Sequence, residues 1–120
     1  MPRMRNVNIF VDVDLTVIDE LGRLLPNAIE GLLTLREAGC KLFLWSTCGA
    51  EYCREVAERY EITPLFEAFL PKPDIYIDDM PSTVLKPLLF DVRDEGDWQI
   101  LADRIVRQHV DPRDRLRPST

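Results

Sequence analysis

Apolar residues occur along the chain in short runs that alternate with segments of helical character. Five runs have the length and composition of buried strands: residues 7–11, 41–45, 66–70, 74–77 and 88–92. Three segments have the spacing or composition of helices: residues 26–38, 50–60 and 98–110. Strands that alternate with helices predict an α/β fold, in which a mostly parallel sheet of about five strands is covered by helices on both faces.

Polar residues follow three of these runs, and they include side chains suited to catalysis. They are Asp12 and Asp14, Ser46 and Thr47, and Asp78 and Asp79. In a parallel sheet the carboxyl ends of the strands meet at one edge, and ligands bind there. The sequence therefore predicts that an active site forms where these residues converge.

Residues 12–16 have the sequence Asp-Val-Asp-Leu-Thr and follow the first predicted strand. Side chains two positions apart on an extended chain point the same way, so Asp12 and Asp14 are expected to face one pocket. A carboxylate beside a metal ion can attack phosphorus, and a second carboxylate can give a proton to the leaving oxygen. Two solvated acids at a strand end are the alternative, although this motif directly after a buried strand is rare by chance.

Hydroxyl and ammonium groups near the other strand ends are suited to binding phosphate. Ser46 and Thr47 stand between a predicted strand and a helix, where hydroxyls and free N–H groups donate to anions, although the position also suits an ordinary helix cap. Lys72 lies between two prolines, which favour an extended backbone. Its ammonium could bind phosphate beside the acids, and the alternative is a solvated lysine in a loop.

Asp78 and Asp79 end the fourth predicted strand, and they suggest a metal site. Adjacent residues of a strand face opposite ways, so one of the two is the better ligand. A site made of Asp12, Asp79, a backbone carbonyl and water offers the hard oxygen ligands that Mg²⁺ prefers.

Composition and charge narrow the class of protein. A chain of 120 residues with 46% hydrophobic and 30% charged residues suits one soluble globular domain. A net charge of −6 disfavours duplex nucleic acid as the main partner, and no apolar run is long enough to span a membrane. The three cysteines are an odd number without zinc-site spacing, and the N-terminus lacks a signal-peptide pattern, so we expect a cytoplasmic protein without disulfides.

Together these residues resemble the motifs of the haloacid dehalogenase (HAD) superfamily. Residues 12–16 match its first motif, Ser46 its second and Lys72 its third, and Asp78 with Asp79 matches its fourth. The resemblance implies a phosphohydrolase that acts on a phosphate monoester through an aspartyl-phosphate intermediate. It also implies a three-layer Rossmann-like fold.

The resemblance assigns a role to each residue that contacts the substrate. Asp12 is the nucleophile, and Asp14 is the general acid and base. Ser46, Thr47 and Lys72 bind the phosphoryl group.

The resemblance also implies one Mg²⁺ ion, bound by Asp12, by the backbone carbonyl of Asp14 and by Asp79. We favour Asp79 over Asp78 because the second residue of this acidic pair usually meets the metal in similar enzymes. Asp78 and Thr16 are then expected to lie next to the metal ligands without contacting the metal themselves.

The chain has no room for a cap domain, because the segments between the motifs are short. We expect one catalytic domain over residues 1–110, a flexible tail over residues 111–120, and an open site. Open members of this superfamily act on larger substrates or close the site with a neighbouring subunit. The expected partners are therefore a phosphorylated small molecule or macromolecule, with a homo-oligomer as a means of covering the site.

Two alternatives come from other classes of protein. A non-catalytic HAD-like or receiver-like module would keep the fold and bind phosphate or a partner. Receivers, however, carry the adjacent acidic pair early, whereas here the spaced pair comes first. A cysteine phosphatase would use Cys48 and Arg54, which fit the spacing C-x₅-R. Against it, Glu51 would place a negative charge in the phosphate-binding loop.

Overall fold

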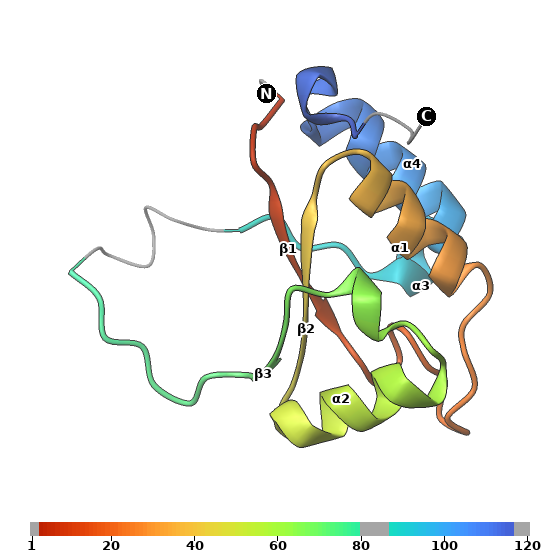
Figure 1. Ribbon diagram of the computed structural model, residues 1–120, viewed down its shortest axis with the longest axis vertical. Coiled ribbons are helices and arrows are strands. Elements are labelled where there is room, and N and C mark those ends of the chain that lie inside the picture. The colour runs from red at the N-terminus through yellow and green to blue at the C-terminus, as the bar shows by residue number, and fades with distance from the viewer. Residues whose placement is uncertain (1–2, 80–86, 117–120) are drawn as a thin grey trace.

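The computed structural model describes residues 3–79 and 87–116, which form an α/β fold (Figure 1). Three strands make one parallel sheet in the order β1-β2-β3: β1 (Asn8–Asp12), β2 (Lys41–Ser46) and β3 (Ala68–Pro71). The helices are α1 (Ala28–Glu37), α2 (Ala50–Arg59), α3 (Val92–Glu95) and α4 (Trp98–His109), and the short 3₁₀ helices are η1 (Thr63–Leu65) and η2 (Pro112–Asp114). The prediction of a parallel sheet with flanking helices is confirmed, and these three strands and the three long helices begin and end within two residues of their predicted bounds.

The central strand β2 explains why this part of the chain folds as the pattern predicts. Leu42, Leu44 and Ser46 alternate along it and are buried, whereas Phe43 and Trp45 point to the other face and are half-buried. The parallel pairing places Asp12 beside Trp45 on one side. On the other side it places Ser46 beside Pro71 of β3. The carboxyl ends of all three strands therefore meet at one edge.

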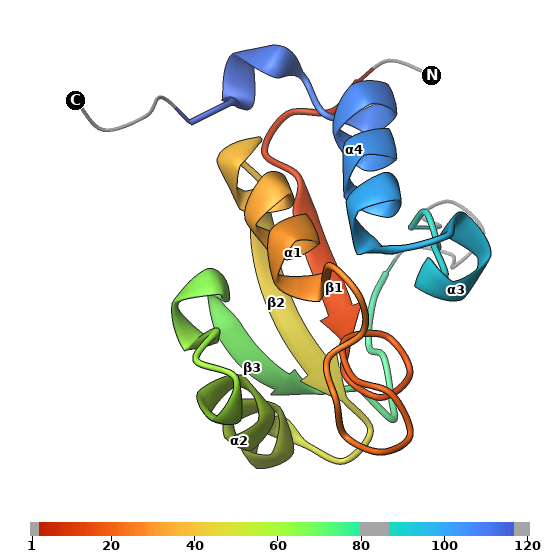
Figure 2. The ribbon, with the colours of Figure 1, turned by 90° about the vertical axis from the view of Figure 1, so that its right-hand side faces the viewer.

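The helices cover one face of the sheet, whereas helices on both faces were predicted. In Figures 1 and 2, α1, α2 and α4 lie on the same side of the three strands. The strand order β1-β2-β3 advances in one direction, and right-handed crossovers then place α1 and α2 on the same face. The three-layer prediction is therefore corrected to two layers for the described residues.

The predicted strands at 74–77 and 88–92 are also corrected, because neither segment pairs with the sheet in the structure. Ile75, Tyr76 and Ile77 are 79%, 77% and 97% exposed. Residues 87–91 have no regular structure, and Val92 begins α3 instead. Among the described residues, β1 pairs only with β2 and keeps a free edge. The backbone N–H and C=O groups of a strand must form hydrogen bonds with an adjacent strand. An apolar sequence alone does not ensure that such a strand lies beside it.

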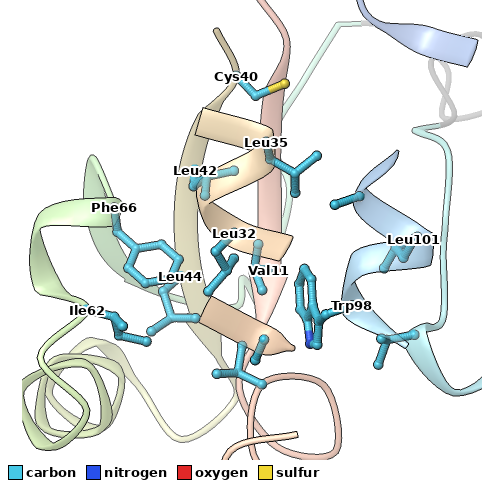
Figure 3. Packing of buried hydrophobic residues seen from close by; sticks show 14 of the residues in the cluster. Val11, Leu32, Leu35, Cys40, Leu42, Leu44, Ile62, Phe66, Trp98 and Leu101 are labelled. Atoms are coloured by element: carbon cyan, nitrogen blue, oxygen red, sulfur yellow. The ribbon is translucent and has the colours of Figure 1, made fainter. Parts of the chain in front are cut away.

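The hydrophobic core lies between the sheet and the helices (Figure 3). Leu32 of α1 packs in the same cluster as Leu44 of β2 and Trp98 of α4, and all three are buried. Helix α1 can approach α4 closely because residue 31 is glycine: a Cβ atom there would lie 2.6 Å from the carbonyl oxygen of Trp98. This close approach fixes Trp98 near the loop that follows β1.

Residues 111–116 make defined contacts, although a flexible tail was expected from residue 111 onward. The backbone N–H of Asn6 donates to Oδ2 of Asp114 at 2.7 Å, and Arg5 Nε lies 2.6 Å from Oδ1. Farther along, the N–H of Leu116 donates to the carbonyl of Glu37 at 2.8 Å. These bonds tie this segment to the start of the chain and to the end of α1. Residues 117–120 lie outside the described residues.

Candidate active site

The contact at the centre of the site joins Lys72 to Asp12. Asp12 is the last residue of β1, and Lys72 directly follows β3. The ammonium Nζ of Lys72 lies 3.2 Å from Oδ1 of Asp12, and both side chains are about one-third exposed. Because β2 separates the two strands, the charged groups meet across the carboxyl edge of the sheet. The structure thus brings together two residues that the sequence assigned to one site.

Strand β2 positions Lys72. The backbone N–H of Lys72 donates to the carbonyl of Ser46 at 3.0 Å, which continues the pairing of β2 with β3 by one residue. The ammonium of Lys72 also lies 5.6 Å from the centre of the Trp45 ring, a distance at which a cation is attracted to an aromatic face. Trp45 is the register partner of Asp12, so the ammonium lies near both the indole ring and the carboxylate of this pair.

Asp14 lies in a tight loop after β1. The carbonyl of Val13 accepts hydrogen bonds from the N–H groups of Thr16, Val17 and Ile18, and Leu15 adopts a left-handed conformation with φ of 60°. The side chain of Asp14 is exposed, and its Oδ1 accepts a hydrogen bond from the hydroxyl of Tyr52 at 2.6 Å. This loop therefore presents Asp14 toward solvent at the end of the strand that carries Asp12.

Thr16 was predicted to lie behind the metal ligands, and the structure connects it to α4. Its carbonyl accepts a hydrogen bond from Nε1 of the buried Trp98 at 2.6 Å. Trp98 is itself fixed by the close packing of α1 against α4. The loop that presents Asp14 is thus supported by the core.

Ser46 and Thr47 occupy the end of β2, but they differ in exposure. Ser46 is only 1% exposed, and its Oγ accepts a hydrogen bond from the N–H of Cys48 at 3.0 Å. That bond uses the acceptor capacity of the hydroxyl, and a hydroxyl can also donate one hydrogen bond. Thr47 is exposed. In this arrangement Thr47 is open to a ligand, whereas Ser46 orders the turn that leads into α2.

Asp78 and Asp79 do not complete a metal site with the other acids among the described residues. Both are exposed and follow the segment that lies outside the sheet. Within residues 3–79 and 87–116 there is no group of three or more acidic, histidine or cysteine side chains that could hold a metal ion. Of the ligands expected for Mg²⁺, Asp12 and the carbonyl of Asp14 stand at the end of β1, while Asp79 does not join them. The oxygen donors fit the chemistry of Mg²⁺, but the set is incomplete in this arrangement.

The geometry disfavours the cysteine phosphatase alternative. A C-x₅-R site needs its arginine to face the loop around the cysteine. Arg54 instead pairs with Glu51 at 2.7 Å and lies 5.7 Å from the centre of the Phe69 ring. The other cysteine of this region, Cys53, is fully buried, and this burial raises the pKa of its thiol.

Two residues of the site were not expected from the sequence. Trp45 directly precedes Ser46, so its place at the strand end could have been noticed, but its packing against Lys72 depends on the strand order. Tyr52 is 38 residues from Asp14, and no local pattern connects the two. The hydrogen bond with Asp14 is the main reason that the pKa of Tyr52 is raised to about 12. Tyr52 therefore stays protonated at neutral pH and acts as a hydrogen-bond donor.

Comparisons of the chain with known protein families, with curated protein sequences and with solved structures found no match. Within the part of the chain that the structure describes, no helix combines the length and apolar character needed to cross a membrane.

Proposed function

We propose that this chain is a Mg²⁺-dependent phosphohydrolase of the HAD type, with Asp12 as the nucleophile. The observation that carries the proposal is the meeting of Lys72 with Asp12 at the carboxyl edge of a parallel sheet. A carboxylate held by an ammonium at this edge, with a second carboxylate two residues on, offers a nucleophile, an anion-binding cation and an acid in one place. Asp14 favours phosphate-ester hydrolysis within the superfamily, since its dehalogenases lack this second acid.

The proposed reaction has two steps that share the same residues. A carboxylate oxygen of Asp12 attacks phosphorus in line with the ester bond, which breaks as Asp14 gives its proton to the leaving oxygen. The product is an alcohol and an aspartyl-phosphate. Asp14, now ionised, removes a proton from a water molecule that attacks the same phosphorus. The bond from phosphorus to Asp12 then breaks, and inorganic phosphate leaves.

The cationic and hydroxyl groups have supporting roles in this reaction. Lys72 would contact a non-bridging oxygen of the phosphoryl group while it remains beside Asp12. The exposed hydroxyl of Thr47 would donate a hydrogen bond to another phosphoryl oxygen. Ser46 is buried, so its hydroxyl would donate only after a change in the turn at residues 46–49 makes it accessible to the substrate.

The expected Mg²⁺ would be held by Asp12, by the carbonyl of Asp14 and by Asp79, and when bound it neutralises charge on the phosphoryl oxygens. This requires residues 74–79 to return toward β1. Residues 73–79 can span roughly 23 Å when extended, and their start is anchored at Lys72 beside Asp12. Asp79 is therefore within reach.

The exposure of the site agrees with a large substrate, or with a site that a second subunit covers. Asp14 and Thr47 are both open to solvent. We propose a phosphorylated macromolecule or a bulky phosphate ester as the preferred substrate. A second subunit that covers the site would have the same effect, because exclusion of water strengthens the contacts with the phosphoryl group.

The decisive experiment measures hydrolysis of p-nitrophenyl phosphate by the full chain with Mg²⁺ and with a chelator. We expect turnover that requires Mg²⁺ and that Asp12→Asn abolishes while the thermal unfolding midpoint stays nearly unchanged. Isothermal titration with Mg²⁺ should show binding that Asp79→Asn weakens, and this measurement does not depend on turnover.

Three outcomes would contradict the proposal. Turnover that persists in chelator and disappears on alkylation of thiols would favour Cys48. Turnover that survives Asp12→Asn would remove the nucleophile. Phosphate or Mg²⁺ binding without any turnover would favour the non-catalytic module.

A further inference from the structure

Tyr52 contacts the proposed general acid directly. It lies in the first turn of α2, and its hydroxyl donates to Oδ1 of Asp14 at 2.6 Å. This distance is at the short end for a hydroxyl and a carboxylate, as expected for a bond to a charged acceptor. The bond joins the helix after β2 to the loop after β1, so two separate elements set its geometry.

The ring of Tyr52 is held more firmly than an exposed side chain would be. It is half-buried and packs against the hydrophobic core, whereas Asp14 is exposed. The core fixes the ring, and the ring fixes the hydroxyl. The hydrogen bond from Tyr52 thereby restricts the rotation of the exposed carboxylate.

We propose that Tyr52 is a positioning residue that orients Asp14 for proton transfer, an inference that rests on the proposed phosphohydrolase function. The hydroxyl of Tyr52 occupies Oδ1, so Oδ2 is the oxygen that carries the proton to the leaving oxygen and later removes one from water. Tyr52 keeps its own proton in both steps.

The role predicts an effect that depends on the leaving group. An alkoxide leaves slowly unless it is protonated, whereas p-nitrophenolate leaves readily without a proton. Loss of an oriented acid should therefore lower kcat/KM, which covers the steps up to release of the alcohol, strongly for an alkyl phosphate and weakly for p-nitrophenyl phosphate. A residue that only stabilises the fold would affect both substrates alike.

The experiment compares Tyr52→Phe with Tyr60→Phe in the full chain with Mg²⁺. Tyr60 is the matched control, because it caps the other end of α2 and its hydroxyl bonds to the carbonyl of Gly22. We expect Tyr52→Phe to lower kcat for glycerol phosphate by about tenfold to hundredfold, the loss typical of one hydrogen bond to a charged group. KM should change little. Any effect of Tyr60→Phe should be equal for the two substrates.

A double-mutant cycle then tests whether Tyr52 acts through Asp14. Asp14→Ala alone should slow the alkyl substrate by about 10²–10⁴-fold. Adding Tyr52→Phe to Asp14→Ala should have no further effect, because the carboxylate that Tyr52 orients is absent. Thermal unfolding of each variant separates a loss of folded protein from a loss of catalysis.

The outcomes distinguish this inference from the proposed function. An equal loss of activity from Tyr52→Phe in the unmodified chain and in the Asp14→Ala variant would overturn the positioning role. An equal loss of kcat/KM for the two substrates would overturn it as well. In both cases the phosphohydrolase function would stand if Asp12→Asn is inactive. Absence of turnover by the unmodified chain would overturn the function and the inference together.

Discussion

Strand β2 and the segment 74–79 are both short apolar runs that end in polar side chains, yet their surroundings differ. β2 lies between two strands, and Leu44 within it is fully buried. The segment 74–79 runs outside the sheet, and Ile77 within it is 97% exposed. Figure 1 shows this contrast, since the chain after β3 leaves the body of the protein.

The difference has a direct consequence for the site. Ser46, at the end of β2, is held in a defined turn and its carbonyl positions Lys72. Asp79, at the end of the exposed segment, belongs to no group of three or more possible metal ligands among the described residues. A strand end positions its polar residue only where neighbouring strands fix the backbone. The residues at the ends of β1, β2 and β3 are therefore in contact with one another, as Lys72 and Asp12 show, whereas residues 74–79 lie outside the sheet.

The largest expected difference between the two segments is in stability. Leu44→Ala should lower the free energy of unfolding by about 2–5 kcal/mol, because it leaves a cavity in the core. Ile77→Ala should change it by no more than about 0.5 kcal/mol, as for an exposed residue. Urea unfolding of both variants measures this. If Ile77→Ala lowered the free energy of unfolding as much as Leu44→Ala does, the contrast would be wrong and the segment would be packed in solution.

A smaller effect is expected when Mg²⁺ is added. Without Mg²⁺, the amides of residues 75–77 should exchange rapidly with solvent, whereas those of β2 should be protected. If Asp79 joins the metal site, Mg²⁺ at 100 times its dissociation constant can stabilise the returned segment by at most about 2.7 kcal/mol, roughly a hundredfold in exchange rate. Hydrogen exchange with mass spectrometry tests this. Asp79→Asn should remove the added protection, and protection that persists in this variant would argue against a metal-linked return.

The smallest expected effect concerns residues 111–116. This polar segment is held by hydrogen bonds to the rest of the protein, whereas the apolar segment 74–79 lies outside the sheet. The pKa of Asp114 is lowered chiefly by the hydrogen bond from the backbone N–H of Asn6, and further by Arg5. A carboxyl whose pKa is lower in the folded state stabilises the fold above its unfolded pKa, near 4. This stabilisation is lost as the pH falls through the lower folded value.

The variant Asp114→Asn tests this anchoring. Its thermal unfolding midpoint should lie below that of the unmodified chain at pH 6–7, and the two midpoints should converge as the pH falls below about 4. A gap that does not change with pH would show that the segment is held without the charge of Asp114.

Much of the fold followed from local pattern. The apolar alternation of β2 and the helical spacing of α1 and α4 are properties of the sequence, and the structure has these elements close to the predicted bounds. The meeting of Asp12 with Lys72 was also expected, because parallel strands bring their carboxyl ends together. These predictions succeed because each depends on neighbours in the sequence or on one general rule of sheets.

Other features depend on which elements meet, and local pattern does not contain that information. Tyr52 touches Asp14 only because α2 packs near the loop after β1. Residues 74–77 have the composition of a strand, but their pairing requires the chain to reach a particular edge. Likewise, the polar segment 111–116 is anchored through Asp114, which its composition did not indicate.

The α/β class, the acidic pair that follows β1 and the positions of these three strands and three long helices could be predicted from the sequence, although two other runs were wrongly predicted as strands. Periodicity and strand-end position fix these features, since both act over a few residues. Tertiary packing sets the shared face of the helices, the contacts of Lys72 with Trp45 and Asp12, and the hydrogen bond from Tyr52 to Asp14. The physical reason is that these contacts join residues far apart in the chain, and they form only after strand order and helix packing are set.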